Sequence, residues 1–152
     1  MDDLAYVNEG IRLQVTGDLK AAISLYKKAL DINPQNFQAL SNLGIALHSL
    51  GREDEAISNF KKATRVNANY TDAPYYLGLI YKAKGNLKKA TEWFTKAIEI
   101  YPGYVQAINQ LGLIFVDEKK YDEAEIMFRQ AIKANPKFVQ AYKNLENLTK
   151  FI

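Results

Sequence analysis

The sequence predicts an all-α fold in which antiparallel helix pairs stack into a solenoid, and three columns of small residues predict it. Each column recurs every 34 residues through four successive repeats. A fixed period of this length is typical of repeat architectures, in which each repeat buries its apolar face only against its neighbours. The columns are Gly10, Gly44, Gly78 and Gly112; Ala22, Ala56, Ala90 and Ala124; and Ala29, Ala63, Ala97 and Ala131.

The repeats account for nearly the whole chain of 152 residues. We expect full repeats at residues 3–36, 37–70, 71–104 and 105–138, followed by a C-terminal capping helix at residues 139–152. Because only two residues lie outside these ranges, any function must be carried by the repeats themselves.

Composition excludes several classes of function. The chain is 48% hydrophobic and 24% charged with a formal net charge of +3, as expected of a soluble folded protein. Lysine and arginine are spread along every repeat, whereas nucleic-acid-binding proteins concentrate them on one face. No apolar run approaches the length of about 18 residues that spans a membrane, and the acidic start Met-Asp-Asp-Leu-Ala does not resemble a secretory signal. We therefore expect a cytoplasmic protein without membrane insertion.

Residues 37–70 show how each repeat is built. Apolar residues from Leu40 to Leu47 recur at steps of three and four, which is the spacing of an amphipathic helix. Gly51 ends this helix, because glycine adopts the left-handed conformation of a helix C-cap at little cost. A second helical run extends from Ala56 to Val66, so the repeat is a helix–turn–helix.

The other repeats follow this plan with small departures. Proline follows three of the second helices, at Pro34, Pro102 and Pro136, and Ala68 takes its place in the second repeat. Lys119 stands where the other repeats have the turn glycine. A lysine in the left-handed conformation costs roughly 1–2 kcal/mol. We therefore expect this turn to be altered or looser.

Large apolar residues keep the same register as the small ones. Small residues that face large ones at fixed positions let neighbouring helices approach closely. We interpret these positions as packing rather than chemistry. The large residues form one column on each helix of the repeat: Leu13, Leu47, Tyr81 and Phe115; and Tyr26, Phe60, Phe94 and Phe128.

This pattern resembles the tetratricopeptide repeat (TPR) family over essentially the whole chain. The resemblance rests on the leucine–glycine pairs of three repeats, the alanine–aromatic–alanine spacing of the second helix, and the closing proline. The leucine–glycine pairs are Leu43-Gly44, Leu77-Gly78 and Leu111-Gly112, and Glu9-Gly10 replaces them in the first repeat. The resemblance implies a right-handed superhelical solenoid of antiparallel helix pairs.

Residues 139–152 resemble the first helix of a fifth repeat, with Tyr142 and Leu145 at core positions. Such a helix covers the open face of the fourth repeat, as a terminal cap does. The last two residues, Phe151 and Ile152, are apolar and unusual on a solvated cap. Either the natural chain continues beyond them or this end packs against another surface.

No arrangement in the sequence indicates catalysis, a metal ion or a cofactor. His48 is the single histidine, there is no cysteine, and there is no glycine-rich phosphate loop. We interpret His48 as a helix-surface side chain, with a lone general base as the alternative. Asp54-Glu55 and Asp122-Glu123 begin second helices, where carboxylates stabilise the positive end of the helix dipole. We therefore expect a protein that is not an enzyme.

In TPR proteins the first helices of the repeats line a concave groove that holds a peptide segment or a partner helix. If this chain is similar, its register places the residues of that groove. The candidate partner-binding residues are Val7, Ile11, Gln38, Ser41, Asn42, Ile45, His48, Asp72, Tyr75, Leu79, Lys82, Gln106, Asn109, Leu113 and Lys143.

Two features of this groove indicate recognition of a partner. An apolar stripe has one residue in each repeat, at Ile11, Ile45, Leu79 and Leu113. This stripe is either a recognition surface, since soluble monomers rarely expose large apolar patches, or it packs half-buried against neighbouring helices. A polar column, interrupted by Asp72, is suited to hydrogen bonds with a peptide backbone. Its members are Gln38, Gln106 and Gln140.

The best-known TPR subclass holds the C-terminal carboxylate of chaperones with lysine, arginine and asparagine side chains on three successive repeats. Here Val7 and Ile11 stand where lysine and asparagine are needed, and Asp72 would repel a carboxylate. Lys143 and Asn147 match only the opening of such a clamp. We therefore do not expect a chaperone adaptor.

The sequence favours a non-catalytic protein–protein interaction scaffold that binds an extended or helical peptide segment in its concave groove. One alternative is a self-assembling structural scaffold, in which the end of one molecule packs into another. A second alternative is a targeting or regulatory module cut from a larger protein. Lysine pairs on the outer surface, Lys27-Lys28 and Lys61-Lys62, are either a solvated ridge or a contact for an acidic partner.

Overall fold

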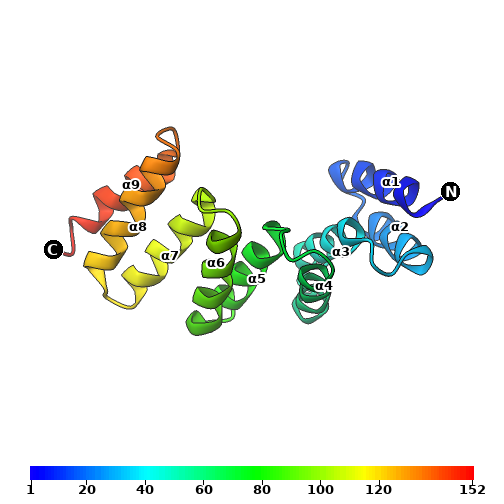
Figure 1. Cartoon of the computed structure of the whole chain (residues 1–152), viewed down its shortest axis with the longest axis horizontal. Helices are drawn as coiled ribbons and strands as arrows, with labels where there is room; N and C mark the ends of the chain where they lie inside the picture. Colours follow the sequence, from blue (N-terminus) through cyan, green and yellow to red (C-terminus); the bar gives the residue numbers. More distant parts are fainter. The chain divides into compact units, whose positions relative to one another are not determined.

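The computed structural model describes residues 1–152 and contains nine α-helices and no strand (Figure 1). This confirms the all-α fold that the sequence predicts. The chain forms two compact units, the N-terminal unit Met1–Ile80 and the C-terminal unit Tyr81–Ile152, which are described separately. The helices are α1 (Asp3–Val15), α2 (Leu19–Ile32), α3 (Phe37–Ser49), α4 (Glu53–Val66), α5 (Asp72–Ala83), α6 (Leu87–Ile100), α7 (Val105–Asp117), α8 (Tyr121–Ala134) and α9 (Val139–Leu148).

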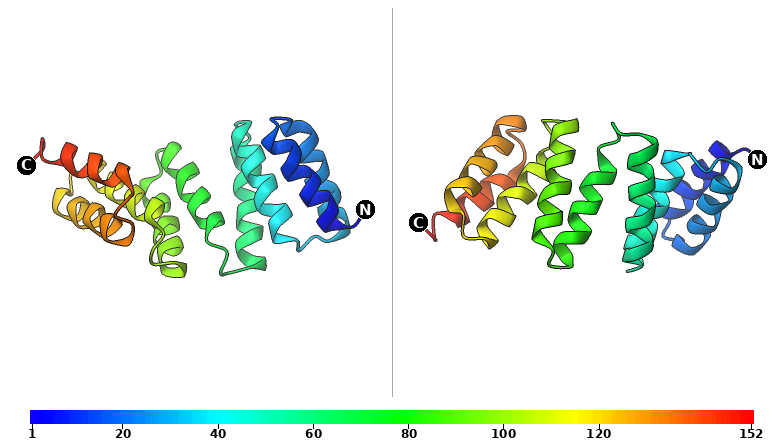
Figure 2. Two further views of the ribbon diagram at one scale, coloured as in Figure 1. Left: turned by 90° about the horizontal axis from the view of Figure 1, so that it is seen from above. Right: turned by 60° about the horizontal axis from the view of Figure 1, so that its bottom comes forward.

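Consecutive helices pack as antiparallel pairs within each unit (Figure 2). In the N-terminal unit α1 packs on α2 and α3 packs on α4, while in the C-terminal unit α7 packs on α8. Contacts of α2 with α3 and of α8 with α9 join each pair to the next helix of the chain. Each apolar face is therefore buried against a neighbour, as a repeat architecture requires.

Side-chain caps begin several of the helices. The Asp18 carboxylate accepts a hydrogen bond from the backbone N–H of Ala21 at 3.1 Å. The side-chain oxygen of Asn36 accepts one from the N–H of Ala39 at 2.9 Å. These caps satisfy donors that the first turn of a helix leaves without a backbone partner. α4 has no such cap and begins with acidic residues, Glu53 first, which the positive end of the helix dipole favours.

The turn between α7 and α8 keeps the geometry of the glycine turns, so the expectation of an altered turn at Lys119 is wrong. Lys119 has a φ of 60°, close to the 75° of Gly51. The N–H of Lys120 donates to the Phe115 carbonyl at 2.8 Å, as the N–H of Arg52 does to the corresponding carbonyl in the second repeat at 2.9 Å. Because these bonds close the end of the helix, the backbone adopts the left-handed conformation despite its cost.

The exit from the second helices is also uniform. The C-cap residue of α2, Asn33, has φ −134° and ψ 93°, and the C-cap residue of α4, Asn67, has φ −135° and ψ 96°. The residue after Asn67 is Ala68 rather than proline. Proline at this place therefore favours the extended conformation without being needed for it.

The glycine column of the first helices is explained by aromatic rings of the second helices. A Cβ atom on Gly10 would lie 2.6 Å from the Tyr26 ring, and one on Gly44 would lie 2.8 Å from the Phe60 ring. These distances are far shorter than carbon–carbon van der Waals contact. Glycine is therefore required wherever a buried ring crosses the first helix this closely.

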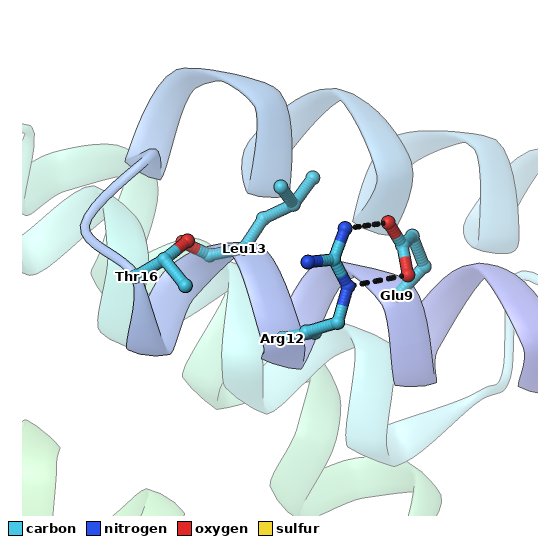
Figure 3. A network of polar contacts seen from close by, with 4 residues as sticks. All are labelled: Glu9, Arg12, Leu13 and Thr16. Carbon is cyan, nitrogen blue, oxygen red and sulfur yellow. Dashed lines mark hydrogen bonds and ion pairs between the residues drawn. The ribbon is translucent and has the colours of Figure 1, made fainter.

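The first repeat departs from leucine–glycine because Glu9 makes an ion pair instead of packing. The Arg12 guanidinium donates two hydrogen bonds to the Glu9 carboxylate, and its Nε lies 2.9 Å from Oε2 (Figure 3). These bonds hold the pKa of Glu9 below its usual value. In the same view the Thr16 hydroxyl donates to the Leu13 carbonyl at 2.9 Å and closes the end of α1. Glu9, Arg12 and Thr16 therefore make polar contacts within or at the end of α1.

The capping helix α9 covers the fourth repeat with a small set of side chains. Ala141 and Leu148 are buried, and Leu148 packs with Ala124 and Phe128 of α8. Tyr142 does not reach the core position expected for it. Its side chain is 46% exposed, and its hydroxyl donates to the Pro136 carbonyl at 3.0 Å. The phenol stays at the surface because no other helix of this chain packs on that side of α9.

The residues after α9 fold back onto the preceding helix pair. The Phe151 ring stacks on the Tyr121 ring with centroids 5.4 Å apart, although Phe151 remains 57% exposed. Part of the apolar C-terminal segment is therefore covered by the fourth repeat itself.

Candidate functional site: the open faces of the first helices

The predicted groove residues differ in how much of each side chain is open to solvent. Five are exposed and seven are half-buried, so these twelve are available for contact with a partner. The exposed residues are Ile11, Gln38, Asp72, Gln106 and Lys143. The half-buried residues are Asn42, Ile45, His48, Tyr75, Leu79, Lys82 and Leu113. The remaining three, Val7, Ser41 and Asn109, are buried.

The three buried residues correct the predicted groove. Val7 is fully buried and packs with Ala29 and Ala39. The fully buried Ser41 donates its hydroxyl hydrogen bond to the Tyr70 hydroxyl at 3.2 Å. These side chains stand at the same position of their repeats and serve packing. A compact side chain at this position is enclosed by the segments that follow it.

Asn109 occupies the same position in the C-terminal unit and is only 4% exposed. Its side-chain oxygen accepts a hydrogen bond at 2.8 Å from the Nδ2 of Asn144, which is also buried. This amide pair joins α7 to α9 and satisfies polar atoms that would be costly to bury alone. Lys143, at the equivalent position of α9, is exposed because no further helix of the chain covers it.

The apolar stripe is partly open in both units. Ile11 is 40% exposed on α1, and Ile45 is half-buried on α3, which contacts α1. Leu113 is half-buried on α7 in the C-terminal unit. Each of these side chains is therefore partly packed and keeps some apolar surface open to solvent.

A hydroxyl–carboxylate network lies next to the stripe in the N-terminal unit. The Tyr70 hydroxyl accepts from Ser41 and donates to the Asp72 carboxylate at 3.5 Å. Its ring packs against the Phe37 ring, with centroids 5.3 Å apart. Burial is the main cause that raises the pKa of Tyr70 above its usual value. The sequence analysis did not identify Tyr70, since it lies in a connecting loop outside the helical register.

His48 is half-buried at the end of α3, and its Nδ1 atom has no hydrogen-bond partner. No group of three or more histidine or acidic side chains is placed to hold a metal ion. The open faces of the first helices combine apolar side chains with amides and a tyrosine hydroxyl.

Lys82 is less available to a partner than its position suggests. Its Nζ donates to the Gln110 side-chain oxygen at 2.8 Å, which links α5 to α7. Partial burial lowers the pKa of Lys82, and the charge of Asp117 opposes that shift. Gln110 is a further residue that the sequence analysis missed.

The C-terminal unit contains a cavity of about 350 Å³ between α7, α8 and α9. We call it the α7–α9 cavity. Of the candidate partner-binding residues Leu113 lines it, and Val116, Asn147 and Lys150 of its lining also stand at groove positions in the register of the first helices. Its lining residues are Leu113, Val116, Phe128, Asn144, Asn147, Leu148, Lys150 and Phe151.

A second cavity of about 350 Å³ lies between α8 and α9. It is lined by Glu125, Arg129, Tyr142, Leu145, Glu146, Leu148, Thr149 and Ile152. The Arg129 guanidinium pairs with the Glu125 carboxylate at its edge, at 2.8 Å.

None of the helices in either unit is both long and apolar enough to cross a membrane.

Solved structures share this fold over nearly the whole chain. The crystal structure of MamA protein matches with a TM-score of 0.86 and 26% identity, over 98% of this chain and 81% of its own. The crystal structure of YrrB, described as a TPR protein with an unusual peptide-binding site, matches with a TM-score of 0.80 and 25% identity, over 99% and 77%. PilF of Pseudomonas aeruginosa matches with a TM-score of 0.88, over 97% and 68%, and at 19% identity shows the fold alone.

Family comparison agrees with the structural likeness, although no curated protein matches the chain in sequence. A model described as TPR repeat matches residues 16–51. A model described as tetratricopeptide repeat matches residues 36–103 and 70–137. These matches extend over most of the chain, so the chain belongs to the tetratricopeptide repeat family.

Proposed function

We propose that this protein is a non-catalytic interaction scaffold that binds an extended or helical segment of a partner protein on the open faces of its first helices. The observation that carries the proposal is the apolar stripe, whose side chains keep open surface on the same set of helices that carries exposed amides. Ile11 and Gln38 provide this combination in the N-terminal unit, and Leu113 and Gln106 provide it in the C-terminal unit. The peptide-binding site described for YrrB, which shares the fold, supports the proposal.

The chemistry of these faces suits a peptide ligand. Apolar side chains of a bound segment gain roughly 25 cal/mol for each Å² of apolar surface that leaves water. Glutamine and asparagine side chains both donate and accept hydrogen bonds, so they can pair with the backbone of any sequence. The partner segment must be ordered on binding, which offsets part of this gain and keeps the affinity moderate.

A pair of matched variants tests the proposal. The groove variant carries Ile11→Asp and Gln106→Ala, at two exposed sites on first helices. The control variant carries Ile32→Asp and Gln130→Ala, the same changes at exposed sites on second helices. Each variant is immobilised, and partners are captured and cross-linked in cell extract, while circular dichroism reports the helix content.

We expect the control variant to retain the partner captured by the natural sequence and the groove variant to lose it, at equal helix content. Cross-links should join the partner to residues of α1, α3 or α7. Equal capture by both variants would contradict the proposal, because the contact would then lie outside the first helices.

Self-association is a second candidate function, and the cavity between α8 and α9 favours it. Tyr142 and Ile152, at its edge, expose apolar surface that a second copy of the chain would cover. Sedimentation equilibrium over a range of concentrations tests this. An average mass that rises with concentration, and that returns to the mass of one chain in Tyr142→Asp, would support self-association. A constant mass of one chain would rule it out.

A further inference from the structure

The α7–α9 cavity has an apolar floor built from all three of its helices. Leu113 and Val116 come from α7, Phe128 from α8, and Leu148 from α9, with Phe151 held at the side by its stack on Tyr121. A volume of about 350 Å³ is at the lower end of the range for ligand pockets in proteins. Such a cavity accepts one bulky apolar side chain of a bound segment.

Two residues that line the cavity differ from their equivalents in the first repeat. There the Tyr26 hydroxyl donates to the Gln14 side-chain oxygen at 2.7 Å and joins the two helices of the pair. The equivalent residues in the fourth repeat are Phe128 and Val116, three periods of 34 residues later. Phenylalanine lacks the hydroxyl and valine lacks the amide, so the fourth repeat does not form this hydrogen bond. Its two side chains present apolar surface to the cavity instead.

The edge of the cavity is positively charged. Lys150, two residues after the end of α9, lines it, and Lys143 lies seven residues earlier on α9. Neither lysine lies within ion-pair distance of a carboxylate, and Lys150 Nζ reaches only the neutral Asn147 side-chain oxygen, at 3.4 Å.

Two nearby carboxylates do not line the cavity. Glu146 lines the opposite cavity, between α8 and α9. Glu118 forms an ion pair with Lys120 at 2.7 Å. No carboxylate lines the cavity, so Lys150 at its edge and Lys143 on α9 favour a ligand that brings its own carboxylates.

Asn147 supplies a third kind of contact. It stands at the position that is apolar in the four full repeats, where the stripe has Ile11, Ile45, Leu79 and Leu113. Its exposed amide can donate to and accept from a peptide backbone. The stripe therefore ends in a polar residue at the cavity.

We infer that the α7–α9 cavity binds a segment of a partner protein in which a bulky apolar residue is flanked by acidic residues. The apolar side chain fills the cavity, the flanking carboxylates pair with Lys143 and Lys150, and Asn147 holds the backbone. This inference deepens the proposed function and rests on it. The carboxylates belong to side chains, so the segment needs no free C-terminus.

Fluorescence polarisation with synthetic peptides and the full chain tests the inference. The probe is a short labelled peptide, blocked at both ends, with one phenylalanine between glutamate pairs. One comparison peptide replaces the phenylalanine with serine, and another replaces the glutamates with lysines. We expect the probe to bind about fivefold or more tightly than either comparison peptide, and its binding to weaken as salt is raised from about 0.05 to 0.5 M.

Three protein variants locate the contact. Lys143→Glu with Lys150→Glu should weaken binding of the probe by about fivefold or more. Lys133→Glu with Lys137→Glu makes the same change at exposed sites outside the cavity and should leave the affinity within about twofold. Val116→Gln with Phe128→Tyr rebuilds the bridge of the first repeat, so it should keep the helix content and lose the binding.

The outcomes separate this inference from the proposed function. Equal affinity for the acidic and lysine peptides, equal effects of the two charge-reversal variants, or binding that survives the rebuilt bridge would each overturn the inference. If no peptide binds while the natural chain still captures a partner that the groove variant loses, the inference fails and the proposed function stands. Loss of capture by the groove variant does not depend on the peptides.

Discussion

The turn between α7 and α8 provides a quantitative test of the backbone reasoning, because Lys119 adopts a conformation that glycine adopts in the equivalent turns. Lys119 has a φ of 60° and is exposed, so Lys119→Gly removes strain without opening the core. Relief of the left-handed conformation is worth roughly 1–2 kcal/mol. The added freedom of glycine in the unfolded chain offsets roughly 0.5–1 kcal/mol of this gain.

The expected net effect of Lys119→Gly is a rise of about 0.5–1 kcal/mol in the free energy of unfolding. For a chain of this length that corresponds to a rise of about 1–4 °C in Tm. Urea and thermal unfolding followed by circular dichroism measure both quantities. Gly51→Ala is the reverse control, since φ at Gly51 is 75° and alanine there should destabilise by about 1 kcal/mol.

An unchanged or lower stability of Lys119→Gly would refute this reasoning, provided that Gly51→Ala is destabilised. It would mean that the Lys119 side chain contributes contacts that outweigh the strain. Chevron analysis would then show whether the loss lies in the folding or the unfolding rate.

Three further predictions concern buried contacts. Gly44→Ala should lower the free energy of unfolding by about 1–3 kcal/mol in urea, because the added Cβ would lie 2.8 Å from the Phe60 ring, and a neutral result would mean that the ring moves freely. Burial raises the pKa of Tyr26 to about 12. The contribution of the neutral Tyr26 phenol to the free energy of unfolding is therefore complete below pH 10 and is lost as the pH rises towards 12. Tyr26→Phe should therefore remove up to about 2.7 kcal/mol of the alkaline loss of stability in urea titrations from pH 9 to 12, and an unchanged pH profile would contradict the shift. Asn144→Ala should cost about 1–3 kcal/mol by leaving the buried Asn109 oxygen without a partner, and Asn109→Ala with Asn144→Ala should cost less than the sum of the single changes in a double-mutant cycle.

The helical fold could be predicted from the sequence because its cause is local and shared by every repeat. A ring at position 26, 60 or 128 needs a glycine on the helix that it crosses, and the 34-residue period records this need. The same holds for the alanine columns, which are fully buried throughout. Contacts that recur in each repeat leave a periodic pattern, so the sequence by itself determined the helix pairs and their order.

The tertiary structure decided which of the predicted groove side chains stay open to solvent. Val7, Ser41 and Asn109 share one position with the exposed Lys143, and their burial depends on the segment that follows each of them. The residues of that segment differ from repeat to repeat, so the 34-residue period does not predict whether the side chain is buried.

The cavity and the turn at Lys119 follow the same distinction. The α7–α9 cavity is lined by residues from three helices, so no single column in the sequence predicts it. The left-handed lysine is adopted because the hydrogen bonds at the end of α7 outweigh a local preference. Local and repeated interactions can be predicted from sequence, whereas burial and cavities depend on the neighbours that the folded chain brings together.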